Sequence, residues 1–133
     1  MKTELLLIDD DDIFIFMSKK MIEKTGFHTA PLVFKNGSLA LDYLKEAYNK
    51  DTSYILFLDI NMPVMNGWEF LDELEEVAVP ENTFVFMLTS SIAEFDKKKA
   101  ETNPFVMKFL SKPVLTSTFE EIKHMSGIRK LFL

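Results

Sequence analysis

Aspartates are concentrated near the start of the chain and recur at a second position further along it. Four of them, Asp9–Asp12, directly follow the apolar run Leu5–Ile8, and Asp59 directly follows a second apolar run, Ile55–Leu58. Two carboxylates ~5 Å apart at an effective dielectric constant near 20 repel each other by ~3 kcal/mol, so carboxylates brought together need a cation. A cluster of negatively charged oxygens selects Mg²⁺, Mn²⁺ or Ca²⁺ over zinc.

A hydroxyl group and an ammonium group follow two other apolar runs in the same way. Thr89-Ser90-Ser91 follows Phe84–Leu88, and Ser111-Lys112-Pro113 follows Phe109-Leu110. If the runs are parallel strands, all these groups lie at the carboxyl edge of one sheet, where open α/β folds bind their ligands. A divalent cation beside a carboxylate and a lysine suits phosphoryl transfer, which depends on positioning and charge neutralisation.

Short apolar runs alternate with stretches of helical spacing along the whole chain. Runs of this length are typical of strands buried on both faces, and the more mixed run Thr29–Phe34 adds a fifth. Asp11 or Asp12 is expected to cap the first helix, and Gly26 to end it. Stripes of apolar residues at helical spacing predict the first three helices: Ile13, Phe14, Met17, Met21 and Ile22; Ala40, Tyr43, Leu44, Ala47 and Tyr48; and Phe70, Leu71, Leu74, Val77 and Ala78. The fourth expected helix is the short exposed stretch Ala93–Thr102, which carries Lys97–Lys99. The fifth is Thr116–His124, capped by Thr116 or Ser117.

Five strand–helix alternations predict an α/β fold, a doubly wound parallel sheet of the flavodoxin-like (βα)5 type with helices on both faces. Pro31 lacks the N–H that a central strand donates, so the second strand belongs at an edge of the sheet. The strand order 2-1-3-4-5 places it there, whereas the order 3-2-1-4-5 would bury it.

The length of 133 residues predicts one domain over residues 1–133, with its core at about residues 3–125 and a short tail at 126–133. No output domain is expected after the tail. The chain contains no cysteine, which excludes a disulfide scaffold and thiol redox chemistry. No apolar run approaches the ~18–20 residues that span a bilayer, so we expect no membrane insertion and a cytoplasmic location.

The net charge of −6 is concentrated in the acidic run, because the rest of the chain sums to −2 once Asp9–Asp12 are set aside. Binding to nucleic acid requires clustered Lys and Arg, so direct nucleic-acid binding is not expected.

Four segments together resemble the receiver domain of two-component response regulators, the CheY-like family. They are Leu7–Asp11, Leu58–Gly67, Met87–Ser91 and Phe109–Pro113. The resemblance covers essentially the whole chain, with the segments in the family's order and at its spacing. The second segment contains the pattern D-x-x-M-P-x-x-x-G, which is long enough to be specific.

The resemblance implies a phosphoryl-accepting role in a two-component phosphorelay. Asp59 would accept a phosphoryl group from a phosphohistidine of a sensor histidine kinase or a phosphotransfer protein. Asp9 and Asp10 would hold Mg²⁺, or Mn²⁺ in its place, together with Asp59 and the backbone carbonyl of Asn61. The protein would then signal by altered binding to a downstream protein, rather than act as an enzyme that turns over a substrate.

The resemblance also implies how the phosphorylated state is recognised. The Thr89 hydroxyl and the Lys112 ammonium would each contact a phosphoryl oxygen, and Phe109 would take the place of the family's aromatic switch residue beside Thr89. The Lys112–Pro113 peptide bond would be cis. The stretch 101–108 departs from the Ala-Gly-Ala-like pattern of many receivers, and its bulkier residues change the face around the fourth helix.

Three other functions remain as alternatives. An aspartyl-phosphate hydrolase of the haloacid dehalogenase type needs a second acid two residues after its nucleophile, where this chain has Asn61. A flavin-binding module of the same fold needs a loop rich in hydroxyl groups and glycine where this chain has Asp9–Asp12. A receiver that binds partners without phosphorylation would not need the complete set of site residues.

Overall fold

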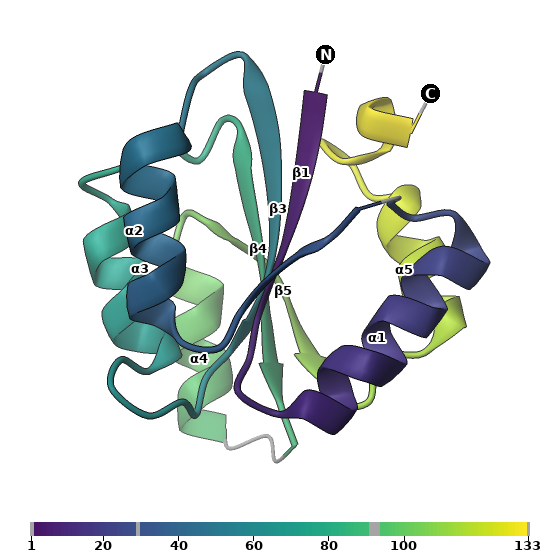
Figure 1. The fold of residues 1–133 in the computed structure, drawn as a ribbon, viewed down its shortest axis with the longest axis horizontal. Coiled ribbons are helices and arrows are strands. Elements are labelled where there is room, and N and C mark those ends of the chain that lie inside the picture. Colours follow the sequence, from purple (N-terminus) through teal and green to yellow (C-terminus); the bar gives the residue numbers. More distant parts are fainter. Residues whose placement is uncertain (1, 29, 91–93, 133) are drawn as a thin grey trace.

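A computed structural model describes residues 2–28, 30–90 and 94–132 of the chain. Five parallel strands form one sheet in the order β2-β1-β3-β4-β5, with helices on both faces (Figure 1). The predicted α/β fold and strand order are therefore confirmed. The elements are β1 (Lys2–Ile8), α1 (Asp12–Thr25), β2 (Leu32–Phe34), α2 (Gly37–Ala47), β3 (Thr52–Asp59), α3 (Gly67–Leu74), β4 (Thr83–Thr89), α4 (Glu94–Thr102), β5 (Val106–Ser111), α5 (Thr116–Lys123) and the short 3-10 helix η1 (Arg129–Phe132).

The second strand lies at an edge of the sheet, as Pro31 predicts. It pairs with β1 through three residues, Leu32–Phe34, and Pro31 immediately precedes them. The missing N–H of proline therefore removes no bond from the interior of the sheet. Two residues at the ends of expected elements, Thr29 and Ala93, lie outside the described residues.

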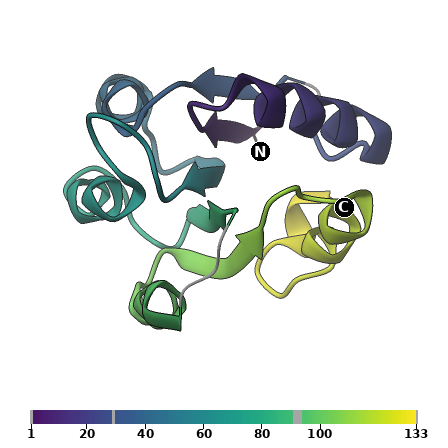
Figure 2. The same ribbon diagram turned by 90° about the horizontal axis from the view of Figure 1, so that it is seen from below.

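Helices α2, α3 and α4 cover one face of the sheet, and α1 and α5 cover the other (Figure 2). Neighbouring residues of a strand point to opposite faces, so a strand covered on both sides is buried on both and mainly apolar. All residues of β3 are buried in this way. The core beneath α1 and α5, called here the second core cluster, consists of Leu5, Leu7, Phe14, Ile22, Phe27, Ile55, Phe57, Phe84, Phe86, Leu88, Leu110, Val114, Phe119, Ile122 and Ile128.

The first helix begins and ends as predicted, but its buried face is narrower than expected. The Asp11 side chain caps its start, and Gly26 ends it with φ +67°. Ile13 is 72% exposed and Met17 is also exposed, so their assignment to the buried stripe is wrong. Ser18 is buried instead, because α1 contacts the molecule along the line of Phe14, Ser18 and Ile22.

The predicted cap of the last helix is also wrong. Leu115 is the residue that precedes the helix, in an extended conformation, and it supplies no side-chain cap. Its carbonyl oxygen accepts hydrogen bonds from the backbone N–H groups of Thr118 and Phe119, so Thr116 already lies within the first turn. The helix ends at Lys123, one residue before the expected His124.

The packed region extends past residue 125, where the core was expected to end. Ile128 has no exposed surface and belongs to the second core cluster. Phe132 follows in η1, and its ring centroid lies 5.0 Å from that of Phe27. In the described ranges, no helix is both long and apolar enough to cross a bilayer.

We predict that Ile128→Ala lowers the free energy of unfolding by about 2–4 kcal/mol, because it removes buried methyl groups and leaves a cavity. Urea unfolding followed by circular dichroism measures the change. Leu39→Ala is the control, because Leu39 is half exposed on α2 and should cost much less. Equal losses in the two variants would show that residue 128 is not part of the core.

Candidate functional site

The polar residues predicted to converge do lie at one edge of the sheet. Asp9 follows β1, Asp59 ends β3, Thr89 ends β4 and Lys112 follows β5. The pairing register aligns the ends of neighbouring strands: Ile8 is opposite Leu58, and Thr89 is opposite Ser111. This edge is the lower end of the sheet in Figure 1, far from both chain termini.

Three carboxylates gather at the end of β1 and β3. Asp9, Asp10 and Asp59 each offer an oxygen atom, and these atoms lie within 4.8 Å of one another. Asp9 and Asp59 are only 1% and 5% exposed, whereas Asp10 faces solvent. At this spacing each charged pair repels by about 3 kcal/mol in a medium of effective dielectric constant 20. The fold therefore assembles a group that needs positive charge.

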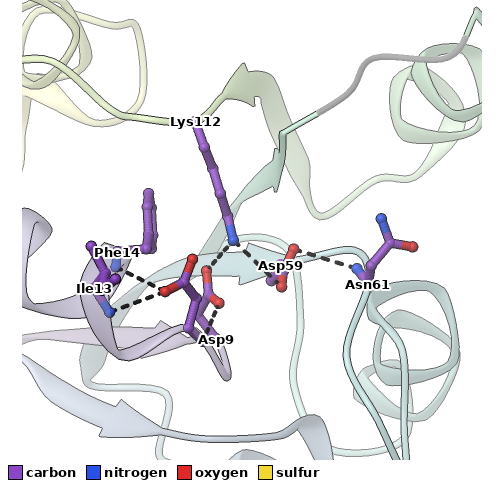
Figure 3. A network of polar contacts seen from close by, with 7 residues as sticks. Asp9, Ile13, Phe14, Asp59, Asn61 and Lys112 are labelled. Carbon is purple, nitrogen blue, oxygen red and sulfur yellow. Dashed lines mark hydrogen bonds and ion pairs between the residues drawn. The ribbon is translucent and has the colours of Figure 1, made fainter.

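Lys112 supplies part of that charge from the opposite side of the site (Figure 3). Its Nζ lies 2.7 Å from Asp9 Oδ2 and 3.5 Å from Asp59 Oδ2. The side chain is mostly buried, so solvent screens these contacts only weakly. One ammonium against three carboxylates leaves an excess of two negative charges when all four groups are ionised.

The remaining donors and acceptors fit a hard divalent cation. Asp9 Oδ1 accepts a hydrogen bond from the backbone N–H of Asp11 at 2.9 Å. Asp9 Oδ2 is buried and, among the described residues, accepts no hydrogen bond, although the Lys112 ammonium lies beside it. A buried carboxylate oxygen with only an ammonium group beside it, grouped with two more carboxylates, offers the hard, negatively charged ligand atoms that Mg²⁺ prefers in proteins.

Burial changes the chemistry of the Asp59 carboxyl. Loss of hydration and the nearby Asp9 charge together raise its pKa from 3.8 to about 6. Lys112 and the backbone N–H of Asn61, which lies 3.4 Å from Asp59 Oδ1, oppose this increase. Burial and the nearby charge thus give Asp59 a raised pKa, and a shifted pKa of this kind is typical of a group with a chemical role.

Thr89 and Phe109 lie on adjacent strands, as expected, but they are not direct partners in the sheet. Phe109 is opposite Met87, and Thr89 lies one pleat further toward the site. Thr89 is buried, and its carbonyl oxygen accepts a hydrogen bond from the backbone N–H of Lys112 at 2.8 Å. This bond joins the end of β4 to the residue that follows β5.

Gly67 lies so close to the backbone of Asp59 that no side chain fits there, which the sequence motif alone does not show. A Cβ atom at this residue would lie 2.8 Å from the backbone oxygen of Asp59 and 3.0 Å from the Cα of Ile60. The N–H of Gly67 also donates to the Ile60 carbonyl at 2.9 Å. Only glycine allows α3 to begin this close to the backbone that carries Asp59.

A strained turn follows Asp59. Val64 has φ +71°, a conformation that β-branched residues rarely adopt, and its side chain is 84% exposed. The backbone N–H of Met65 donates to the Pro63 carbonyl at 2.8 Å and closes a three-residue turn. Backbone strain of this kind costs about 1–3 kcal/mol and is concentrated near functional sites.

A family model of the response regulator receiver domain matches residues 5–124 of this chain. The chain belongs to this family. The curated relatives agree with the assignment. The probable methanogenesis regulatory protein FilR2 of Methanothrix harundinacea is 28% identical over 124 residues, which are 90% of this chain and 80% of FilR2. The transcriptional regulatory protein CpxR of Escherichia coli is 33% identical over 94 residues, 71% of this chain but only 36% of CpxR.

Solved receiver structures share the whole fold of this receiver domain. A two-component response regulator from Cytophaga hutchinsonii superposes with a TM-score of 0.83 at 32% identity, covering 99% of this chain and 98% of the other. The Vibrio cholerae chemotaxis protein CheY4 gives 0.73 at 22% identity, covering 91% and 95%, which supports the fold alone. The protein is thus a CheY-like receiver of two-component signalling.

We predict that Asp59→Asn stabilises the metal-free protein at pH 7.5 by about 1–3 kcal/mol. The folded-state pKa of about 6 lies above the ordinary value of 3.8, so the ionised carboxylate is penalised in the folded state. This penalty is complete above pH 6 and disappears as the pH falls from about 6 to below 4. The higher free energy of unfolding of Asp59→Asn, relative to the wild type, should therefore disappear as the pH falls from about 6 to below 4.

Urea unfolding with a chelator at pH 7.5 and pH 4 measures this difference. Asp42→Asn is the control, because Asp42 is an exposed aspartate on α2, away from the cluster. An advantage of Asp59→Asn that is the same at both pH values would contradict the assignment.

Proposed function

We propose that this receiver accepts a phosphoryl group on Asp59 from a phosphohistidine of a sensor histidine kinase or phosphotransfer protein. The observation that carries the proposal is the placement of Asp59 at a sheet edge, where its buried carboxylate shares the Lys112 ammonium with Asp9. The phosphorylated protein would signal by altered binding to a downstream protein. We also propose that it acts in the cytoplasm.

The transfer itself is a substitution at phosphorus. An Asp59 carboxylate oxygen attacks the phosphorus atom, the bond from phosphorus to the histidine nitrogen breaks, and the electron pair of that bond returns to the imidazole. Lys112 lies 3.5 Å from Asp59, where its ammonium would pair with an oxygen of the transferred group. The Thr89 hydroxyl, at the end of the adjacent strand, would donate to another.

The same site would hold Mg²⁺, or Mn²⁺ in its place. The ligands would be Asp9, Asp10, Asp59 and the backbone carbonyl of Asn61. When bound, the ion supplies neutralisation of the charge on the phosphoryl oxygens. The fit is supported by Asp9 Oδ2, a buried carboxylate oxygen that faces the Lys112 ammonium and, within the described residues, has no further hydrogen-bond partner.

The residue two positions after Asp59 distinguishes this proposal from a phosphatase. Asn61 has an amide side chain there, which cannot serve as a general acid or base, and its backbone N–H donates to Asp59. The chain therefore has no acid at the position where a hydrolase of the haloacid dehalogenase type requires one. This favours a phosphorylated product that persists long enough to signal over rapid turnover.

The surface beside the site is suited to another protein. Ile13, Phe16 and Met17 are exposed on the outer side of α1, directly after the acidic run, and Val64 is exposed in the loop after Asp59. Exposed apolar side chains grouped near a reactive centre mark a protein-contact surface. They support a macromolecular phosphoryl donor over a small phosphate ester.

We predict that Asp59 is the only phosphorylation site. Incubation with acetyl phosphate and Mg²⁺ should add one phosphoryl mass to the wild type and none to Asp59→Asn, because the amide is not a nucleophile. Intact-mass spectrometry measures the product. Asp42→Asn is the matched control and should behave as the wild type. Normal phosphorylation of Asp59→Asn would disprove the assignment.

We predict that Thr89→Ala separates phosphorylation from the response around Phe109. The variant should still be modified on Asp59, but the NMR shift changes that phosphorylation causes around Phe109 should disappear, because the hydroxyl is the link between the phosphoryl group and β4. Ser111→Ala is the control, since Ser111 is the exposed partner of Thr89 on β5. Identical shift changes around Phe109 in Thr89→Ala and the wild type would refute the coupling.

A further inference from the structure

The aromatic ring of Phe14 lies against the ammonium group of Lys112. The distance from Lys112 Nζ to the ring centroid is 4.5 Å, the shortest cation–π distance among the described residues. Phe14 belongs to the first turn of α1, just after the acidic run, and stands next to Lys112 in Figure 3. The backbone N–H of Phe14 donates to the capping carboxylate of Asp11, so the start of the helix fixes the residue in place.

The ring is not explained by core packing alone. Phe14 is buried at the site end of the second core cluster, where a leucine would fill most of the same space. The electron-rich face of an aromatic ring, unlike a leucine, attracts a nearby cation. Because both the ring and Lys112 are largely shielded from water, the attraction is stronger than at an exposed site.

The attraction of the ring differs from that of Asp9 in one respect that matters for the site. Lys112 is held by Asp9 at 2.7 Å and by Asp59 at 3.5 Å, and both carboxylates belong to the group that fits a divalent cation. An ammonium that depends on Asp9 loses that partner when Asp9 binds a metal ion. Phe14 is neutral and is not a ligand, so it can hold the ammonium without competing for the ion.

We propose that Phe14 is a positioning residue that keeps the Lys112 ammonium beside Asp59 while Asp9 is occupied by a divalent cation. This inference rests on the proposed phosphorylation of Asp59. Without the ring, the long lysine side chain can leave the site for solvent in the metal-bound state. The transfer rate is then reduced by the fraction of molecules in which the ammonium is still in reach of the phosphoryl group.

Removing the ring should lower the phosphorylation rate without weakening Mg²⁺ binding. Phe14→Leu should lower the rate of phosphorylation by acetyl phosphate at saturating Mg²⁺ about three- to tenfold. The same variant should bind Mg²⁺ no more weakly than the wild type, because an ammonium that can move away repels the ion less. General damage to the site would instead weaken both.

Three further variants make the test specific. Phe14→Tyr keeps an aromatic ring and should retain a rate near that of the wild type. Phe27→Leu removes a buried ring from the same core cluster, but Phe27 packs among Phe57, Phe119 and Phe132 and should leave the rate unchanged. Asp10→Asn removes a carboxylate of the cluster and shows that the Mg²⁺ titration detects a weakened site.

NMR provides a readout that does not depend on phosphorylation. The ring current of Phe14 should shift the ε-methylene protons of Lys112 upfield in the Mg²⁺-loaded wild type, and this shift should be absent in Phe14→Leu. The resonance is assigned by its loss in Lys112→Arg. An identical shift in the wild type and Phe14→Leu would overturn the inference whether or not Asp59 is phosphorylated.

The kinetic outcomes are equally decisive. A rate in Phe14→Leu within twofold of the wild type, an equal loss in Phe27→Leu, or a loss accompanied by weaker Mg²⁺ binding would each overturn the positioning role. If the wild type is modified neither by acetyl phosphate nor by a phosphohistidine-carrying phosphotransfer protein but the Lys112 shift depends on Phe14, the proposed function is wrong and the contact stands.

Discussion

The repulsion between Asp9 and Asp59 is the constraint on which the rest of the site depends. Both carboxylates are buried at the ends of adjacent strands, and an isolated buried charge is far more costly than an exposed one. The pair is tolerated because Lys112 lies between them, while the third carboxylate, Asp10, faces solvent. Each remaining feature of this edge either brings these charges together or compensates for them.

The core supplies the stability that offsets this cost. Strand β3, which carries Asp59, is buried on every residue, as is its neighbour β4, and β1 is buried over its last four residues, Leu5–Ile8. Burying one large apolar side chain contributes about 1.5–3 kcal/mol, comparable to the repulsion of one carboxylate pair. The apolar strands therefore do more than form the sheet, because they hold the charged ends at a separation that the charges alone would not adopt.

The amino-acid pattern predicts the position of the site better than its details. Four apolar runs ending in Asp9, Asp59, Thr89 and Lys112 are sufficient, because parallel strands bring their carboxyl ends to one edge whatever the loops between them do. The edge position of β2 followed from the missing N–H of Pro31. These inferences depend on backbone hydrogen bonding, which is common to all parallel sheets.

The features that could not be predicted depend on local packing. The spacing of Ile13 predicts that it faces the core, but in α1 its side chain points to solvent. A stripe of apolar residues does not determine the rotation of a helix about its axis to within one residue. Ile128 reads as part of a tail, yet it fills a gap in the core. Phe14 fits the apolar stripe of α1, and nothing in the sequence shows that its ring meets an ammonium group rather than another side chain.

Two departures from regular structure lie at the same edge of the sheet as the carboxylates. Val64 adopts a left-handed conformation, and Gly67 begins a helix against the backbone of Asp59. Natural sequences break local rules mainly where function requires it, and the cost is met by consistent structure elsewhere. At the opposite end of the sheet, the buried polar side chain of Asn82 has a hydrogen-bond partner, because the Tyr48 hydroxyl donates to its Oδ1 at 2.5 Å.

The balance of charge indicates where a signal would leave the site. Asp9, Asp10 and Asp59 together carry three negative charges against the single positive charge of Lys112, and a divalent cation would bring the sum to zero. A phosphoryl group on Asp59 adds charge again, and its oxygens compete with Asp9 for the Lys112 ammonium. Because the backbone of Lys112 is bonded to Thr89, any movement of that lysine acts on the ends of β4 and β5. If phosphorylation of Asp59 shifts the backbone at Lys112, this bond would pass the shift to β4 and β5 rather than to the β2 edge.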